Sequence, residues 1–89
     1  MKMDINFLRN KIDRLDAKIL RLIKKRLKLA KQMGKLKDVQ GIKVEDKKRE
    51  EEVYKSLKKN ARKLNIDSTF VVKIYEQIID QSKKAQSKT

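Results

Sequence analysis

An apolar residue recurs alternately every fourth and third position from Leu8 to Leu36, and no proline interrupts the pattern. This spacing places the residues on one side of a helix and repeats every seven residues. The stripe, in which a single arginine occurs, consists of Leu8, Ile12, Leu15, Ile19, Leu22, Arg26, Leu29, Met33 and Leu36. Gly41 is a natural terminator because glycine accepts the left-handed conformation that ends many helices. The pattern predicts one long helix over residues 5–39.

Two shorter amphipathic segments follow the long helix. Asp46 can cap a second helix over residues 47–63, because its carboxylate can accept hydrogen bonds from the first backbone N–H groups. Asp67 or Ser68 can do the same for a third helix over residues 69–87. The predicted fold class is therefore all-α, with one long and two shorter helices in each protomer.

The predicted first helix is too long for a compact monomer. At 1.5 Å per residue it spans roughly 50 Å, whereas a compact globule of this chain length has a radius of gyration of about 12 Å. The projecting part of the stripe would expose leucine and isoleucine to water. We therefore expect a single domain over residues 1–89 that forms an intertwined, obligate homodimer. A coiled-coil dimer without any binding site explains the stripe equally well.

The charge balance favours anionic partners. The chain has 26 Lys and Arg against 12 Asp and Glu, a formal net charge of +14, and such an excess attracts polyanions and steers small anions. The basic residues are spread along the chain, however, and only four aromatic residues could stack on bases. We therefore expect most lysines to cover solvated helix faces, and we do not expect nucleic acid to be the partner.

The residue types that are missing narrow the chemistry. The chain has no cysteine and no histidine, so a thiolate nucleophile, a typical transition-metal site and a neutral-pH imidazole base are not expected. Residues 1–7 show no apolar run typical of a signal peptide, and no segment approaches the length of a membrane span. These features predict a soluble, cytoplasmic protein without a membrane association.

Arg26 stands between Leu22 and Leu29 in the apolar stripe. A buried guanidinium needs an anion, which is either a carboxylate of a partner helix that sets the register or a bound ligand. Lys37 lies eleven residues further on, within about 20° of the same face and roughly 16 Å along the axis, so the two cations could bracket a small anion. Viewed alone, Lys37 is a solvated lysine at a helix end.

Arg9 lies 17 residues before Arg26, roughly 25 Å along the axis and about 100° around it. If both arginines bind one small ligand, Arg9 must therefore come from the other protomer. Viewed alone, Arg9 is an exposed arginine beside the stripe.

Polar residues also gather at the ends of the shorter helices. Capping and the helix dipole explain Asp46 and Glu50, but both could accept a hydrogen bond from a substrate hydroxyl while Arg49 holds a carboxylate. Ser82 and Gln86 are one turn apart on the third helix. The ends of amphipathic helices usually face water, and a place in a binding site is the alternative for this pair.

Five pieces of the sequence, taken in order, match one known family. They are Leu8-Arg9-x-x-Ile12-x-x-Leu15-Asp16, Arg26-x-x-x-Ala30, Gly34-x-x-Lys37, Asp46-x-x-Arg49-Glu50 and Ser82-x-x-x-Gln86. No single piece is specific, but together, with an arginine inside the heptad stripe, they resemble the all-helical chorismate mutases. The resemblance implies an isomerase that converts the dianion chorismate to prephenate, without a cofactor or metal, in the biosynthesis of Phe and Tyr. It also implies a homodimer with shared active sites.

The resemblance further assigns roles to matching positions. Arg26 and, from the other protomer, Arg9 would bind the two substrate carboxylates, and Ser82 would help to hold the carboxylate end. Lys37 and Gln86 would contact the ether oxygen of the bond that breaks.

Asp46 and Glu50 would lie beside the ring hydroxyl, and Arg49 would support the site without touching the substrate. An isochorismate pyruvate lyase on the same scaffold needs a similar cationic pocket, but the complete pair of Asp46 and Glu50 favours the mutase. A non-enzymatic basic helical dimer that binds nucleic acid gives no reason for an arginine in the stripe.

Overall fold

The computed structural model describes residues 4–87, and the secondary structure in this part of the chain is helical without strands. Helix α1 comprises Ile5–Gln40, α2 comprises Lys47–Lys63 and α3 comprises Ser68–Ser87. Each bound lies within one residue of the sequence-based expectation. The outermost residues of the expected 1–89 domain lie outside the described part. No described helix combines the length and the apolar character needed to cross a membrane.

Local hydrogen bonds explain where α1 begins and ends. The Asp4 carboxylate accepts a hydrogen bond from the backbone N–H of Phe7 at 2.8 Å. At the other end Gly41 has a φ of 69°, and its N–H donates to the carbonyl of Asp38 at 3.2 Å. The expected glycine terminator is therefore present, and it turns the chain away from the helix axis.

The two shorter helices are capped by aspartates. Asp46 accepts a hydrogen bond from the backbone N–H of Arg49 at 3.0 Å, and Asp67 accepts one from Thr69 at 3.0 Å. In the turn between α2 and α3, Asn65 takes the left-handed conformation, with a φ of 57°. Asparagine tolerates this conformation better than most residues, so the chain reverses here and forms an α2–α3 hairpin.

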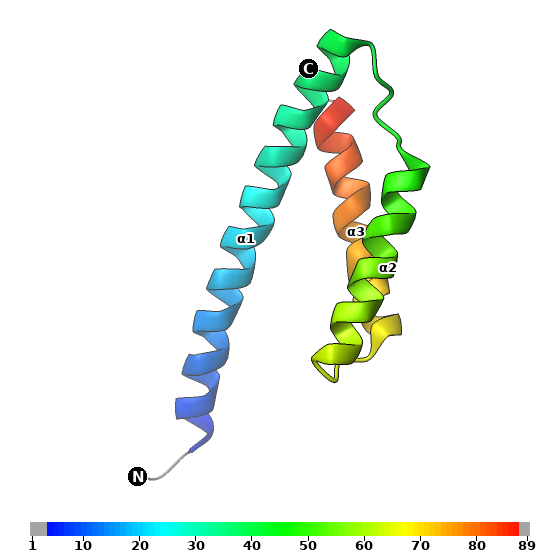
Figure 1. Cartoon of the computed structure of the whole chain (residues 1–89). Helices are drawn as coiled ribbons and strands as arrows, with labels where there is room; N and C mark the ends of the chain where they lie inside the picture. Colours follow the sequence, from blue (N-terminus) through cyan, green and yellow to red (C-terminus); the bar gives the residue numbers. More distant parts are fainter. Residues whose placement is uncertain (1–3, 88–89) are drawn as a thin grey trace.

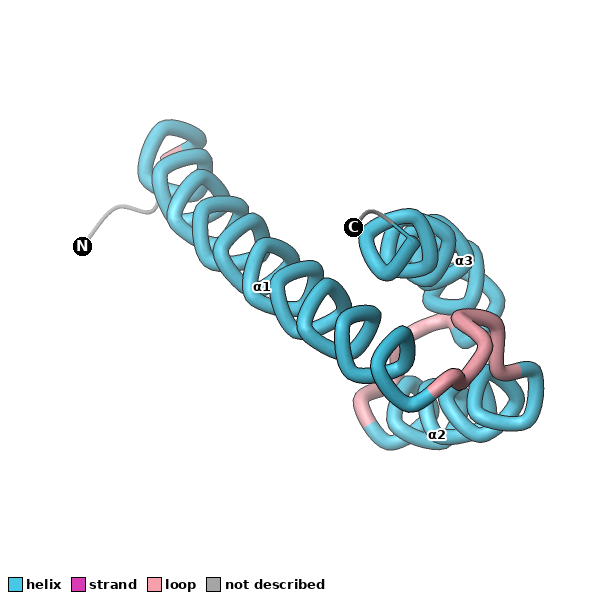
Figure 2. The backbone as a smooth tube through the Cα atoms, turned by 90° about the horizontal axis from the view of Figure 1, so that it is seen from above, coloured by secondary structure: helices cyan, strands magenta, loops and turns pink. Residues whose placement is uncertain are grey.

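Helix α3 is the element that joins the molecule. Both α1 and α2 pack against α3, whereas α1 and α2 do not pack directly on each other in the described part of the chain. The α2–α3 hairpin lies beside the C-terminal half of α1, and the N-terminal half of α1 projects away from it (Figure 1). Seen along the other direction, α1 again diverges from the hairpin toward its N-terminus (Figure 2).

Gly34 sets how closely α1 and α3 cross. A Cβ atom at this position would lie 2.6 Å from the Cα of Gln86, closer than real Cβ contacts come. Any larger residue would separate the helices, so the absent side chain positions Gln86 beside α1.

The interior of one chain is small. Among residues 4–87, the buried ones are Ala30, Gly34, Ala61, Ile79 and Ser82. The chain has dimensions of 59 × 27 × 15 Å and a radius of gyration of 16.7 Å, well above the value for a compact globule. Its accessible surface is 8024 Å², against about 5,500 Å² for a folded monomer of this mass. One protomer therefore leaves much of its apolar surface uncovered.

The heptad stripe makes up a large part of the exposed apolar surface. Leu15, Leu22 and Leu29 are 56%, 62% and 63% exposed, although each occupies an apolar position of the repeat. Along the projecting half of α1 the stripe is exposed, whereas Arg26 further along it donates a hydrogen bond to Ser82 of α3.

Candidate active site

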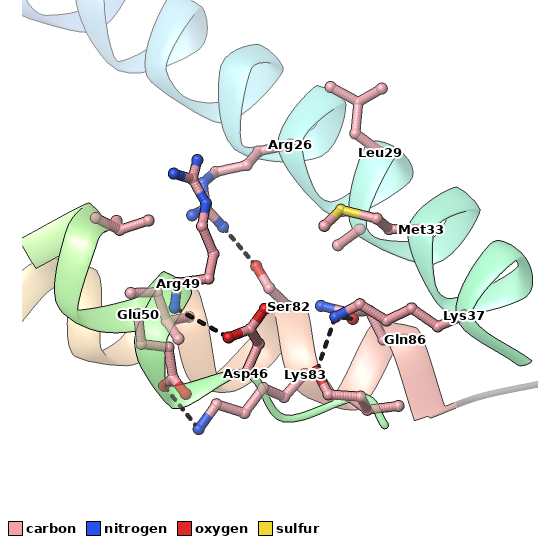
Figure 3. Close-up of a pocket in the computed structure, with 14 residues that line it drawn as sticks. Arg26, Leu29, Met33, Lys37, Asp46, Arg49, Glu50, Ser82, Lys83 and Gln86 are labelled. Atoms are coloured by element: carbon pink, nitrogen blue, oxygen red, sulfur yellow. Dashed lines mark hydrogen bonds and ion pairs between the residues drawn. The ribbon is translucent and has the colours of Figure 1, made fainter. Parts of the chain in front are cut away.

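A cavity of about 330 Å³ lies between the C-terminal half of α1, the first turns of α2 and the C-terminal half of α3. Its apolar wall includes Leu29, Met33, Val53 and Ile79. The volume is at the lower end of the range for small-molecule sites. Seven of the eight residues singled out from the sequence line it, namely Arg26, Lys37, Asp46, Arg49, Glu50, Ser82 and Gln86 (Figure 3).

Arg26 is held by α3. Its Nη1 donates a hydrogen bond to the Oγ of Ser82 at 2.6 Å, and its guanidinium carbon lies 5.8 Å from the ring centre of Tyr75. Ser82 is 6% exposed and donates in turn to the carbonyl of Ile78 at 2.8 Å. Because a guanidinium has five N–H donors, this contact orients Arg26 and leaves donors for a ligand.

The anion expected beside Arg26 is not a side chain of the same protomer. Within residues 4–87, no carboxylate lies within ion-pair distance of this guanidinium. The side chain is half-buried at the edge of the cavity rather than enclosed, and its hydrogen-bond partner in this protomer is Ser82.

Lys37 links three segments. Its Nζ donates to Oε1 of Gln86 at 2.8 Å and to the carbonyl oxygen of Val44 at 2.9 Å. These two bonds hold the ammonium group against Gln86 and Val44. The expectation that Lys37, viewed alone, is a solvated lysine at a helix end is therefore wrong. Gln86 and Ser82 are likewise turned inward from α3, not toward water (Figure 3).

The first turns of α2 contribute the acidic side of the cavity. Asp46 lines the cavity and caps α2 at the same time. The carboxylate of Glu50 is paired with Lys83 Nζ at 2.9 Å, and Glu45 approaches the same ammonium at 3.6 Å. The hydrogen bond from Lys83 to Glu50 is the main cause that raises the pKa of Lys83 above its usual value.

Arg49 occupies the outer rim. Its side chain is 64% exposed, and its guanidinium pairs with the carboxylate of Glu52 at 3.5 Å. A group so exposed gains little from the pair, and it can turn toward an anion at the cavity mouth.

Arg9 does not reach this cavity within one protomer. It is exposed on the projecting N-terminal half of α1, far along the helix from the C-terminal half that lines the cavity. This placement agrees with the helical geometry, in which Arg9 and Arg26 of one chain cannot grip one small ligand.

Two contributors were missed by sequence reasoning. Lys83 lines the cavity between Ser82 and Gln86, and its place three residues before Gln86 puts it on the same helix face. That spacing could have identified it, but many other lysines carry the same chemistry. Val44 contributes a carbonyl oxygen from a loop, for which the sequence has no signal.

The cavity has a positive balance. In the described part of the chain, four cationic side chains line it against two carboxylates; the cations are Arg26, Lys37, Arg49 and Lys83, and the anions are Asp46 and Glu50. Such an arrangement suits a small anion with several carboxylates and at least one hydroxyl.

The fold and cavity define a small all-helical protein with a pocket for an anion, and the comparisons with known proteins specify the family. The family model for chorismate mutase type II matches residues 8–87, so the chain belongs to this family of isomerases. The comparisons favour neither the lyase nor the nucleic-acid alternative.

Individual relatives agree with this assignment. A chorismate mutase of Methanocaldococcus jannaschii is 37% identical over 79 residues, which cover 89% of this chain and 80% of that protein. A bifunctional chorismate mutase/prephenate dehydratase of Aquifex aeolicus is 37% identical over 54 residues, 61% of this chain but only 15% of that protein. The solved structure of a conserved hypothetical protein from Pyrococcus furiosus has a TM-score of 0.71 at 34% identity, covering 97% of this chain and 99% of that one.

Proposed function

We propose that this protein is a cytoplasmic chorismate mutase that rearranges chorismate to prephenate for the synthesis of Phe and Tyr. One observation carries the proposal beyond family membership. Two cations eleven residues apart on α1, Arg26 and Lys37, line the same cavity, and each is hydrogen-bonded by a side chain of α3. Cations fixed in this way are preorganised for an anion and need little rearrangement when it binds.

The proposed reaction needs no nucleophile, metal or general base, because it is a unimolecular [3,3] rearrangement. Its demands are to hold the enolpyruvyl arm folded over the ring and to stabilise negative charge that grows on the ether oxygen. Lys37 and Gln86 meet the second demand in this proposal. Oε1 of Gln86 accepts from Lys37, so the amide NH₂ of Gln86 is left to donate, and the ammonium has a third N–H beyond its two bonds.

Arg26 binds one substrate carboxylate in this proposal, with Ser82 holding the guanidinium in place. Arg9 of the partner subunit binds the other carboxylate. Fork-shaped guanidinium groups suit carboxylates because two parallel hydrogen bonds form at once.

The shared site requires an intertwined homodimer, and the exposed stripe supports one. The accessible surface of 8024 Å² exceeds that of a typical monomer by about 2,500 Å² per chain, an area comparable with that buried in obligate homodimers. Packing the stripe against a second copy covers it, and a partner's α1 can then bring Arg9 to the cavity.

Asp46 and Glu50 accept a hydrogen bond from the ring hydroxyl in this proposal, and Arg49 supports the cavity mouth. The complete pair of acceptors favours the mutase over a lyase on the same scaffold.

The direct test is the loss of chorismate absorbance when the purified protein is added, with isochorismate as the parallel substrate. We expect chorismate to disappear and prephenate to accumulate in stoichiometric amount. Release of pyruvate from isochorismate with no change in chorismate would refute the proposal in favour of the lyase.

A further inference from the structure

We propose that Lys83 is a positioning residue that holds Glu50 ready to accept the ring hydroxyl of the substrate; this inference rests on the proposed mutase function. No role for Lys83 follows from the motifs that identify the family. The residue nevertheless lines the cavity, and its ammonium contacts two acidic side chains of different segments (Figure 3).

The geometry ties α3 to the start of α2. Lys83 Nζ lies 2.9 Å from Oε1 of Glu50 and 3.6 Å from Oε1 of Glu45, which stands in the loop before α2. The Glu50 side chain is 23% exposed and that of Lys83 is 34% exposed, whereas Glu45 is 56% exposed. The stronger and better shielded contact is therefore the one to Glu50.

The contact with Lys83 reduces the repulsion between Glu50 and an anionic substrate. A carboxylate that faces a dianionic substrate repels it, and the repulsion is larger in a partly buried site than in water. Lys83 compensates the charge of Glu50 from the side and engages one oxygen of the carboxylate. The second oxygen remains an acceptor, so Glu50 can bind a hydroxyl without repelling the carboxylates of the same molecule.

The contact also restricts rotation of Glu50. An unpaired glutamate on the first turn of a helix samples several rotamers, and each immobilised side chain costs free energy on binding. Because Lys83 fixes the carboxylate before the substrate arrives, this cost does not fall on the binding step.

The expected signature is a split between KM and kcat. The ring hydroxyl is not part of the bonds that form and break, so its contact with Glu50 is equal in the ground state and the transition state. Such uniform binding changes KM and leaves kcat nearly unaltered. Lys83→Gln should therefore raise KM for chorismate about tenfold, the size of one part-exposed charge-assisted hydrogen bond.

Lys84→Gln is the matched control. Lys84 is the next residue on α3, pairs with the exposed Asp80 at 3.4 Å and does not line the cavity. Its replacement removes the same charge, so an effect of net charge alone would raise KM equally in both variants. We expect Lys84→Gln to keep the wild-type KM and Lys83→Arg to recover most of the loss.

A double variant separates positioning from direct binding. In a Glu50→Gln background, Lys83→Gln should add almost no further increase in KM, because the residue that it positions is already altered. Full additivity of the two changes would show that Lys83 acts on the substrate itself and would overturn the inference. So would an unchanged KM in Lys83→Gln, measured on protein whose circular dichroism matches the wild type. An inactive wild-type protein would instead overturn the proposed function, and the inference with it.

Discussion

Replacing Gly34 by alanine should reduce turnover far more than stability. The new Cβ would lie 2.6 Å from the Cα of Gln86 and 2.8 Å from its carbonyl carbon, and it would overlap the carbonyl oxygen. Carbon atoms attract best at about 3.5–4.0 Å, so α1 and α3 must separate by about 1 Å. All three contacts are with backbone, and rotation of a side chain cannot relieve them.

The effect on stability is a difference of two opposing contributions. Overpacking typically costs about 1–3 kcal/mol, and the higher helix propensity of alanine returns about 1 kcal/mol. The net loss in free energy of unfolding is therefore about 0–2 kcal/mol. The helix propensity of alanine does not offset the effect on activity. When α3 moves, Gln86 moves with it, and the hydrogen bond between Lys37 and Gln86 is disturbed. A misplacement of about 1 Å can cost on the order of 100-fold in rate.

Gly41→Ala is the control for this prediction. Gly41 has a φ of +69°, and the methyl group of an alanine there would have no neighbour within 4 Å. The substitution therefore costs about 1–2 kcal/mol of left-handed strain without a clash with the site. Thermal unfolding of both variants should show losses of similar size, whereas chorismate turnover should be far lower in Gly34→Ala than in Gly41→Ala. Wild-type turnover in Gly34→Ala would refute the claim that this crossing positions Gln86.

Two further predictions concern single groups. Lys37→Ala should lower kcat by about 10²–10³-fold, as loss of one transition-state donor does, while Lys35→Ala, exposed on the same helix, keeps wild-type kcat; equal kcat in both would exclude a role for Lys37. The pKa of Lys83 is raised chiefly by its hydrogen bond to Glu50, and that of Tyr54 chiefly by burial. Both groups bind their protons more tightly in the folded protein than in the unfolded chain. Their contribution to the free energy of unfolding is therefore lost as the pH rises past about 10. Thermal unfolding should show wild type more stable than Lys83→Gln at pH 8, with the gap narrowing as the pH rises above about 10.5; a gap that widens would contradict this sign.

The helices could be predicted from the sequence because their signals are local. The spacing of leucines from Leu8 to Leu36, the glycine at 41 and the aspartates at 46 and 67 act within one or two turns. These residues placed all three helices to within one residue of their observed bounds. The same pattern showed Arg26 as an exception among apolar neighbours.

The contacts between helices could not be predicted in the same way. Ser82 and Gln86 look like ordinary polar residues near a helix end, and only the packing of α3 on α1 turns them toward Arg26 and Lys37. Lys83 is one of many lysines until the hairpin brings it to Glu50. Such pairs depend on distant parts of the chain, and a single sequence has no local signal for them.

Subunit mixing tests the shared cationic site most directly. Arg9→Ala and Arg26→Ala homodimers should each be nearly inactive, because every site lacks one arginine. After complete exchange in an equimolar mixture, about one quarter of all sites should contain both arginines if Arg9 acts across a two-fold interface. We expect turnover to recover to about that fraction of the wild type. No recovery, with heterodimers demonstrated by native mass spectrometry, would contradict a site built from two chains.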